Sequence, residues 1–382
     1  MNRSLAVLLG GLCITALLCT GCSTAAADIQ ADPVSLSETV TGWQTTDSGI
    51  CYIRNGEPVT GWMELGGDFF YFRSNGGLVT GWLSLDGNRY YLGSDGAAYR
   101  GVREVDGNLY VFNGQGLLTT GWAEVDGKLY CGNENGHPLS GWQDIGGVRY
   151  YFAEDYAAQT GWMALNGFTY YFNNDGSAAR GKTEIDGRTH YFAFNGQEIV
   201  LTNPWNEMPE DYSVTLTDIE GGHQVADIAY DDLQAMFSAG KAAGVSPAVC
   251  SSYRTVEYQT KLFQKKVNYY LDKGYSEAEA YATASTIIAV PGTSEHHLGL
   301  ALDLVDNHNW TLDESQAETA AQKWLMANSW RYGWILRYPD GSSESTGIIY
   351  EPWHYRYVGL ELAKELYEAD LTLEEYLQNL TQ

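Results

Sequence analysis

The chain has 382 residues, which is enough for two or three domains. Its 48 acidic residues outnumber the 22 lysines and arginines, so the formal net charge is −26. Such a surface repels a phosphate backbone, which excludes nucleic acid as a partner. A content of 44% hydrophobic and 13% aromatic residues also excludes a mostly disordered chain.

The first residues have the pattern of a secretory signal, because Arg3 precedes an apolar stretch that runs from Leu5 to Cys19. Residues 18–22 resemble a bacterial lipobox, although Cys19 stands where that family usually has Leu. The resemblance implies cleavage after Gly21 and lipidation of Cys22, which would anchor the chain on a membrane. Ordinary secretion is the alternative. We therefore expect a lipoprotein signal peptide over 1–21 and a polar tether over 22–41.

Three cysteines remain after the signal segment: Cys51, Cys131 and Cys250. Their odd number and wide spacing predict neither a disulfide framework nor a cysteine metal site. We expect three buried thiols, with a bridge between Cys51 and Cys131 as an alternative that no pattern supports.

A repeat of 20 residues follows the tether. Gly-Trp pairs recur with this period, and each is followed five residues after its Gly by a turn pair such as Asp86-Gly87 or Asn166-Gly167. These pairs accept the positive φ angles of a type I′ turn, so each unit is predicted to be one β-hairpin. Stacked hairpins can bury aromatic side chains, which predicts an all-β hairpin solenoid over residues 42–200. Its expected core consists of the repeat tryptophans Trp62, Trp82, Trp122, Trp142 and Trp162.

The unit at residues 81–96 resembles the choline-binding and glucan-binding cell-wall repeats of Gram-positive surface proteins. In that family, choline lies in aromatic cages between consecutive repeats. In this chain, only Phe69 is aromatic among the residues at the cage position. In chain order these residues are Phe69, Arg89, Leu109, Leu129, Arg149, Thr169 and Thr189. We therefore expect the repeats to bind a wall glycan or teichoic acid rather than choline, and a spacer without a ligand is the alternative.

The glycine period stops after Asn203-Pro204-Trp205, and residues 201–382 are predicted to form an α+β domain. The expected helices are 231–243, 257–272, one capped by Ser276 that runs to 288, 315–331 and 360–367. The expected strands are 248–253, 300–305, 334–337 and 348–357.

The stretch Ser294–Asp303 contains two histidines followed by a strand pattern. Gly299 and Ala301 share strand parity with Asp303 and would clear space beside it for a metal, while the leucines between them face the core. The spacing leaves open whether His296 or the adjacent His297 is the ligand.

Glu351 and His354 form a second cluster, in which one group can bind a metal and the other can act on its water. Two histidines and Asp303 leave the fourth position of a zinc ion open, as in hydrolytic sites. Glu351 is then the natural general base. Each residue alone would more often be a surface or structural group, so the interpretation depends on the combination.

The pattern Ser294-x-His296-x-x-Gly299-x-Ala301-x-Asp303 with Glu351-x-x-His354 resembles the VanY-type D-alanyl-D-alanine carboxypeptidases, zinc peptidases of the LAS group (lysostaphin, D-Ala-D-Ala peptidase, sonic hedgehog). The resemblance extends over about residues 203–370 and implies one catalytic Zn²⁺. It implies that His296, Asp303 and His354 are the zinc ligands and that Glu351 is the general base. It implies that Arg254 is a clamp for the substrate or the oxyanion. It also implies that Ser294 and Gln259 are polar substrate contacts.

The resemblance implies removal of a C-terminal D-alanine from peptidoglycan stem peptides by an enzyme held outside the cytoplasm, at the membrane through Cys22 and at the wall through its repeats. Two alternatives remain open. The first is an LD-carboxypeptidase or a peptidoglycan endopeptidase, because the same metal site attacks any amide placed over it. The second is a wall-binding surface protein without enzyme activity.

Overall fold

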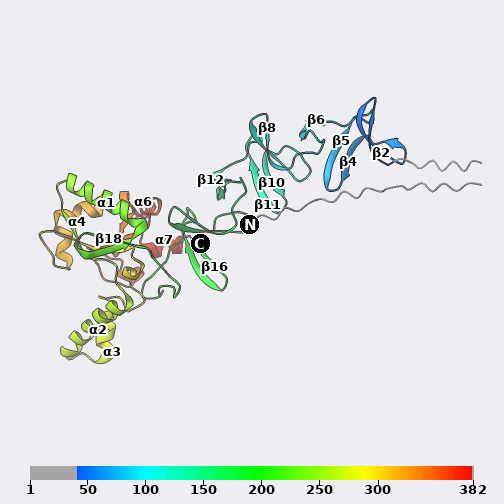
Figure 1. Cartoon of the computed structure of the whole chain (residues 1–382). Coiled ribbons are helices and arrows are strands. Elements are labelled where there is room, and N and C mark those ends of the chain that lie inside the picture. Colours follow the sequence, from blue (N-terminus) through cyan, green and yellow to red (C-terminus); the bar gives the residue numbers. More distant parts are fainter. Residues whose placement is uncertain (1–40, 381–382) are drawn as a thin grey trace, which may run out of the picture. The chain divides into compact units, whose positions relative to one another are not determined.

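The computed structural model describes residues 41–380 (Figure 1). The predicted signal peptide, the predicted lipidation site Cys22 and most of the expected tether lie outside the described residues. Two compact units divide the described chain: residues 41–61 with 72–78, and residues 62–71 with 79–380. Among residues 41–380, no helix has the length and apolar character needed to cross a membrane.

The first unit is a three-stranded antiparallel sheet of β1 (Gly42–Thr46), β2 (Gly49–Arg54) and β3 (Glu57–Pro58). The Trp43 ring packs on Phe72 with their centroids 5.9 Å apart. The Leu78 N–H donates to the carbonyl of Ile50 at 2.7 Å, which ties the end of the unit back to its middle strand.

The second unit begins with a series of two-stranded antiparallel hairpins. The turn residues Asp86 and Gly87 have φ angles of 52° and 81°, and Asn166 and Gly167 have 52° and 80°. Both central residues are thus in the left-handed region, which confirms the type I′ turns. The strands are β4 (Gly61–Leu65), β5 (Asp68–Phe72), β6 (Gly81–Leu85), β7 (Asn88–Leu92), β8 (Gly101–Val105), β9 (Asn108–Phe112), β10 (Gly121–Val125), β11 (Lys128–Gly132), β12 (Gly141–Ile145), β13 (Val148–Phe152), β14 (Gly161–Leu165), β15 (Phe168–Phe172), β16 (Gly181–Ile185) and β17 (Arg188–Phe192).

Backbone hydrogen bonds join each hairpin to the preceding one. The segment after one hairpin donates to the second strand of its neighbour, as in Leu118 N–H to the Arg89 carbonyl and Ala178 N–H to the Arg149 carbonyl, both at 2.8 Å. The repeats therefore stack as a solenoid, as the sequence predicts.

The repeat tryptophans are not the centre of the stack, and this prediction was wrong. The Phe side chains at the end of the second strand of a hairpin are buried, as Phe172 and Phe192 at 0% exposure show. By contrast, Trp122 and Trp162 are 40% and 41% exposed. A planar Trp covers such a Phe from outside, as Trp162 covers Phe192 at 6.0 Å. In two repeats a guanidinium then covers the indole: Arg89 over Trp82 at 4.2 Å and Arg149 over Trp142 at 4.7 Å.

The α+β domain contains a four-stranded antiparallel sheet in the order β20-β21-β23-β22. Its strands are β20 (Pro247–Ser251), β21 (Ala301–Asp306), β22 (Trp334–Leu336) and β23 (His354–Tyr357). Leu302, Leu304 and Tyr355 point from the sheet into a core that contains Leu233 of helix α1 (Asp227–Ala242) and Leu325 of helix α4 (Ala320–Asn328). This confirms the core-facing side of the predicted strand. Strand 348–357 is shorter than predicted, because Pro352 cannot donate to a ladder.

The helices follow the predicted order with one break. The expected helix 315–331 is divided because Thr319 is extended and caps a new helix with its side chain, which accepts from the Gln322 N–H. The observed helices are α1 (Asp227–Ala242), α2 (Val256–Asp272), α3 (Glu277–Ser285), η2 (Glu295–Leu298), η3 (Glu314–Glu318), α4 (Ala320–Asn328), η4 (Ser329–Tyr332), α5 (Ser343–Thr346), α6 (Leu360–Ala369) and α7 (Leu373–Asn379). A further hairpin consists of β18 (Leu216–Ile219) and β19 (His223–Ala226), joined by η1 (Glu220–Gly222).

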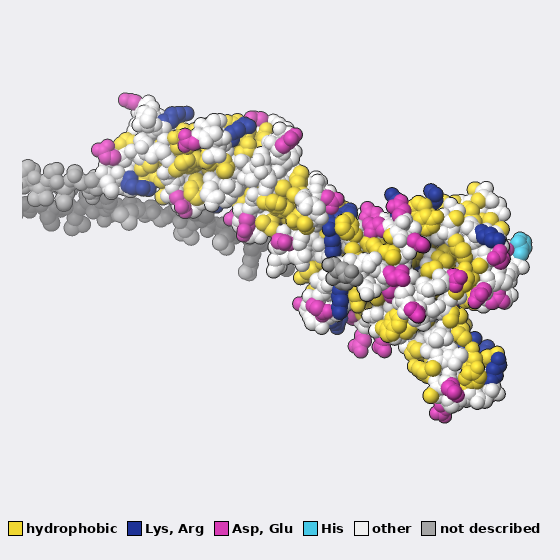
Figure 2. Space-filling view, turned by 180° about the vertical axis from the view of Figure 1, so that it is seen from behind, with side chains coloured by type: hydrophobic (Ala, Val, Ile, Leu, Met, Phe, Trp, Pro, Cys, Tyr) yellow, Lys and Arg dark blue, Asp and Glu magenta, His cyan; other side chains and the backbone are white. Residues whose placement is uncertain are grey.

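Helices α2 and α3 form an antiparallel pair that projects from the domain (Figure 1). Their own small core contains Phe263, Val267, Ala280 and Ala284. Figure 2 shows Lys or Arg side chains gathered on this lobe, and the sequence supplies Lys261, Lys265, Lys266 and Lys273.

The last repeat residues belong to the hydrophobic core of the C-terminal helices. Ala193 and Ile199 pack in one cluster with Leu362, Leu366 and Leu373. The Gln197 amide donates to the Val358 carbonyl at 3.0 Å, and the Phe168 ring stacks on Tyr357 with an interplanar angle of 15°. The division between repeats and enzyme domain at residue 200 thus remains a prediction, and side-chain contacts cross it.

The three cysteines are free thiols, so the alternative bridge between Cys51 and Cys131 is not formed. Cys51 and Cys131 are buried as expected, but Cys250 is only half-buried.

Candidate metal centre

The sheet register brings two of the predicted ligands together. Asp303 in β21 lies directly opposite His354 in β23, and both side chains lie on the face away from Leu302 and Tyr355. Cross-strand neighbours on one face have Cβ atoms about 4.5–5.5 Å apart, so two residues 51 positions apart in sequence meet side by side.

His296 comes from η2, immediately before β21. The chain turns into the strand at Gly299, which has a φ of 69°. A Cβ atom there would lie 2.9 Å from Leu216 Cδ2 and 3.3 Å from the Ala226 nitrogen. Gly299 is therefore required for the turn and does not lie in the strand, which corrects the prediction that it clears space beside Asp303.

The three donor atoms converge on one point. His296 Nε2 and His354 Nδ1 lie 3.3 Å and 3.1 Å from Asp303 Oδ1, and all three groups are at most 4% exposed. His296 Nδ1 lies 2.8 Å from the Ser252 carbonyl oxygen, to which it must donate. Its Nε2 lone pair then faces a carboxylate, an arrangement that a metal cation between the two groups would stabilise. One ligand atom from each residue lies within 4.8 Å of the others, so the set fits a divalent metal ion.

His297 has a different role from His296. Its Nε2 accepts from the Gly292 N–H at 3.3 Å, and its Nδ1 donates to the Arg254 carbonyl at 2.7 Å. Both ring nitrogens are thus occupied by backbone groups. Of the two histidines between which the spacing left the choice open, His296 is the one in the candidate metal cluster.

The charges of the cluster follow from burial and from close partners. Burial, together with the positive charge of Arg254, lowers the pKa of His296 to about 4, so this ring is neutral at pH 7. Burial also disfavours the charged forms of Asp303 and His354. The neighbouring His296 and His354 nevertheless hold the pKa of Asp303 well below its usual range. Hydrogen bonds to Asp303 and Glu295 raise the pKa of His354 to about 9.

Glu351 lies beside the cluster without belonging to it. Its Oε2 is 3.6 Å from His354 Nδ1, and its side chain is 11% exposed. Burial and the negative charge of Asp303 raise the pKa of Glu351 to about 8, against the opposing charge of His354. A carboxyl group with a pKa near neutrality can both take up and release a proton.

Arg254 contacts the metal ligand directly in this structure. Its Nη2 donates to Asp303 Oδ2 at 2.7 Å, and its Nη1 donates to Gln259 Oε1 at 3.3 Å. Gln259 is fully buried and donates from Nε2 to the Ala289 carbonyl. Thr255, and not Gln259, caps helix α2. Gln259 therefore fixes the guanidinium of Arg254 in place.

The cluster opens into a pocket of about 390 Å³. Ser294, Arg254 and Glu351 line it together with the ligands, and apolar walls come from Leu262, Ile288, Leu312 and Ile348. Helix α2 adds Tyr258 and Lys266. Every predicted catalytic and substrate-binding residue of the domain is thus at one pocket.

Sequence reasoning missed the charged groups behind the ligands. Glu295, Arg337 and Arg356 are 1–2% exposed, and Glu295 forms an ion pair with each of the two arginines. The available signal in the sequence was a charged residue directly beside a predicted ligand or at a strand position predicted to be buried. Charged side chains are buried only when they are paired with an opposite charge.

Comparison with known families agrees with this geometry. Residues 222–360 match the VanY family, described as D-alanyl-D-alanine carboxypeptidase. Residues 159–205 match a choline-binding repeat, and residues 80–98 match a putative cell wall binding repeat.

The D-alanyl-D-alanine carboxypeptidase of Enterococcus faecalis is 45% identical over 180 residues, which are 47% of this chain and 65% of that protein. The putative carboxypeptidase YodJ of Bacillus subtilis is 40% identical over 151 residues, 39% of this chain and 52% of that protein. The chain thus matches less than two thirds of the length of these relatives.

A crystal structure of the vancomycin resistance D,D-pentapeptidase VanY from a VanB-type cassette, in complex with Zn(II), is 44% identical with a TM-score of 0.43. The match covers 47% of this chain and 97% of the chain in that crystal structure. The chain therefore combines cell-wall-binding repeats of the choline-binding type with a VanY-type domain, which contains the metal-ligand cluster.

Proposed function

We propose that the chain is a zinc-dependent carboxypeptidase that removes the C-terminal D-alanine from peptidoglycan stem peptides. The observation that carries this proposal is the convergence of His296, Asp303 and His354, with Glu351 at 3.6 Å from His354 in the same pocket. Two imidazoles and one carboxylate make a three-ligand zinc site of the hydrolytic kind.

A zinc ion held by these residues would supply Lewis acidity for the scissile carbonyl and for a water molecule. Glu351 takes the proton from the attacking water and later gives it to the leaving amine. Asp303 and His296 are held in place by Arg254 and by the Ser252 carbonyl, so the ligand atoms need not reorganise during the reaction.

Arg254 is proposed as the clamp for the substrate carboxylate or for the developing oxyanion. Three of its five N–H groups donate to Ser251, Gln259 and Asp303. The remaining two belong to a guanidinium that lines the pocket, where Ser294 is proposed as a further polar contact. Gln259 is proposed to act through Arg254.

The repeats are proposed to bind a wall glycan or teichoic acid. The support is the match to wall-binding repeats together with the exposed Trp62, Trp122 and Trp162, whose rings offer flat apolar surfaces. Lipidation of Cys22 is proposed to hold the chain at the outer face of the membrane of a Gram-positive cell. Two attachments would raise the local substrate concentration without any new contact in the active site.

The test is D-alanine release from a synthetic stem pentapeptide by the purified, zinc-loaded chain, followed by mass spectrometry. We expect loss of one D-alanine, abolition by a chelator and recovery on addition of Zn²⁺. The matching tetrapeptide and a cross-linked dimer are assayed in parallel. Cleavage of only these would favour the LD-carboxypeptidase or endopeptidase alternative, and no cleavage of any substrate would favour a wall-binding protein without activity.

A further inference from the structure

The two histidine ligands are oriented by different kinds of group. The Nδ1 of His296 donates to a backbone carbonyl, that of Ser252. The Nε2 of His354 instead faces a side chain, because it lies 3.4 Å from Glu295 Oε2. The proposed general base Glu351 lies on the other side of the His354 ring, beside Nδ1. A carboxylate behind a histidine ligand fixes the ring and makes its other nitrogen a stronger donor to the metal.

Glu295 is held in one orientation by two buried arginines. Its Oε1 accepts from Arg337 Nε at 2.8 Å and from Arg356 Nη1 at 2.9 Å, which leaves Oε2 directed at His354. Arg356 lies two residues after His354 in β23, so both side chains project from the same face of the strand. The position of Oε2, and with it the ring of His354, therefore depends on where these guanidinium groups are held.

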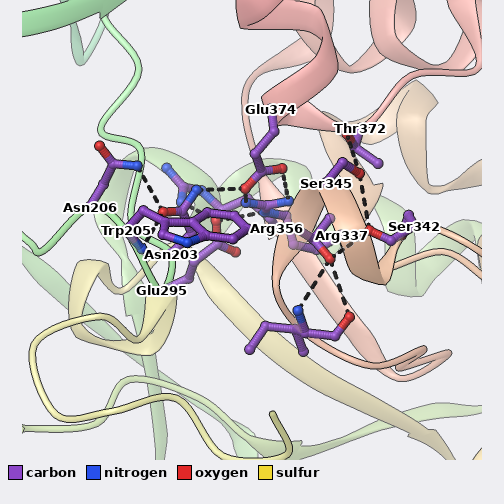
Figure 3. A network of polar contacts seen from close by, with 12 residues as sticks. Asn203, Trp205, Asn206, Glu295, Arg337, Ser342, Ser345, Arg356, Thr372 and Glu374 are labelled. Atoms are coloured by element: carbon purple, nitrogen blue, oxygen red, sulfur yellow. Dashed lines mark hydrogen bonds and ion pairs between the residues drawn. The ribbon is translucent and has the colours of Figure 1, made fainter. Parts of the chain in front are cut away.

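Each arginine has a second anchor, and Figure 3 shows the one of Arg337, the carboxylate of Glu374. Arg337 makes a bidentate ion pair with Glu374 in the first turn of α7, at 2.8 Å and 2.5 Å. Arg356 Nη2 donates to the Val200 carbonyl at 3.1 Å. Asn203 also donates to Glu374, at 2.9 Å. Val200 and Asn203 belong to the segment that leads from the repeats into the enzyme domain.

We infer that Glu295 is the positioning residue for the metal ligand His354, and that the ion pair between Arg337 and Glu374 transmits the placement of α7 and of the repeat junction to the affinity for zinc. This inference rests on the metal site of the proposed function and adds a dependence on residues outside the pocket. A network that served only the stability of the fold would leave the affinity of the folded protein for zinc unchanged.

The test compares Glu295→Gln and Glu374→Gln in the full-length chain with Glu368→Gln, which removes the same charge from an exposed position in α6. The probes are Zn²⁺, titrated against a competing chelator, and Co²⁺, whose visible spectrum reports the ligand geometry. We expect the Kd for zinc to rise about 10- to 100-fold in Glu295→Gln, the usual effect of removing a partner behind a ligand. We expect a smaller rise in Glu374→Gln, a changed cobalt spectrum in both, and parental behaviour of Glu368→Gln.

Glu295→Gln leaves two buried arginines with less compensating charge, which destabilises the fold of this variant. Glu374→Gln then decides, because Glu374 is partly exposed and Arg337 keeps Glu295. Circular dichroism of the metal-free proteins identifies the folded variants. A folded Glu374→Gln with the parental Kd and cobalt spectrum would overturn the inference, as would a parent that binds no zinc. A parent that binds zinc but releases no D-alanine would refute the proposed activity and leave the inference in place.

Discussion

The repeats and the enzyme domain are built by opposite rules. In the repeats, each hairpin is specified by residues within its own 20 positions, and the backbone hydrogen bonds between repeats join neighbouring units. In the enzyme domain, the working parts come from distant positions, as with Asp303 and His354, which are 51 residues apart. The difference teaches that a local pattern can specify a scaffold, whereas a catalytic site requires long-range register.

The junction between the two regions does not follow this division. Ile199 and Ala193 belong to the repeat pattern, yet they are buried among Leu362 and Leu366 of the C-terminal helices. The last repeat is thus part of the enzyme domain's core as well as the end of the solenoid.

Deletion of the repeats should therefore have the largest effect on the activity of the enzyme domain. We expect deletion of residues 42–200 to abolish activity on a soluble pentapeptide. The deletion removes Ile199 from a hydrophobic core in which one buried side chain contributes about 1.5–3 kcal/mol to stability. It also removes the Val200 carbonyl that accepts a hydrogen bond from Arg356. Deletion of 42–140 retains the last hairpins. We expect it to preserve that activity within about two-fold, which corresponds to a change of roughly 0.4 kcal/mol in the activation free energy. Binding to purified cell walls should fall. Parental activity of the 42–200 deletion would show that the enzyme domain is independent.

Substitution of Glu351 by Gln tests the chemistry of the pocket without removing a proposed ligand. We expect kcat for D-alanine release to fall about 10²- to 10⁴-fold, the usual contribution of a general base. Zinc content, measured on the purified variant, should remain at one ion per chain. Glu368→Gln serves as the matched control. Turnover within tenfold of the parent would remove Glu351 from the mechanism.

Within the repeats, Phe172 and Trp162 separate stability from surface function. Phe172 is fully buried against Trp142 and Tyr170, so we expect Phe172→Ala to destabilise the array by about 3–5 kcal/mol in urea unfolding. Trp162 is 41% exposed, so Trp162→Ala should cost less. Trp162→Ala should instead weaken retention on cell walls. Equal destabilisation by both substitutions would mean that the tryptophan is a core residue after all.

The sequence predicted the parts whose causes are local and the residues of the metal centre, but not what holds them. Asp-Gly and Asn-Gly pairs between two strand patterns favour type I′ turns, so the hairpins followed from the sequence. Thr319 broke a predicted helix because its side chain could cap a new one. Glu295, Arg337 and Glu374 could not be connected, because the bonds between them join positions 42 and 37 residues apart and no spacing rule relates them.

The smallest expected effect concerns Lys266, the lysine that lines the pocket from helix α2. It lies seven residues after Gln259, about 10 Å along the helix, where it can meet a carboxylate of a longer substrate upstream of the scissile bond. A partly exposed ion pair is worth about 0.2–1 kcal/mol, so Lys266→Met should raise KM for a pentapeptide by about 1.4- to five-fold. The effect should shrink at high salt and be absent for a short substrate that does not reach α2. Lys265→Met, its exposed neighbour outside the pocket, is the matched control, and an equal change in both variants would indicate only a general effect of charge.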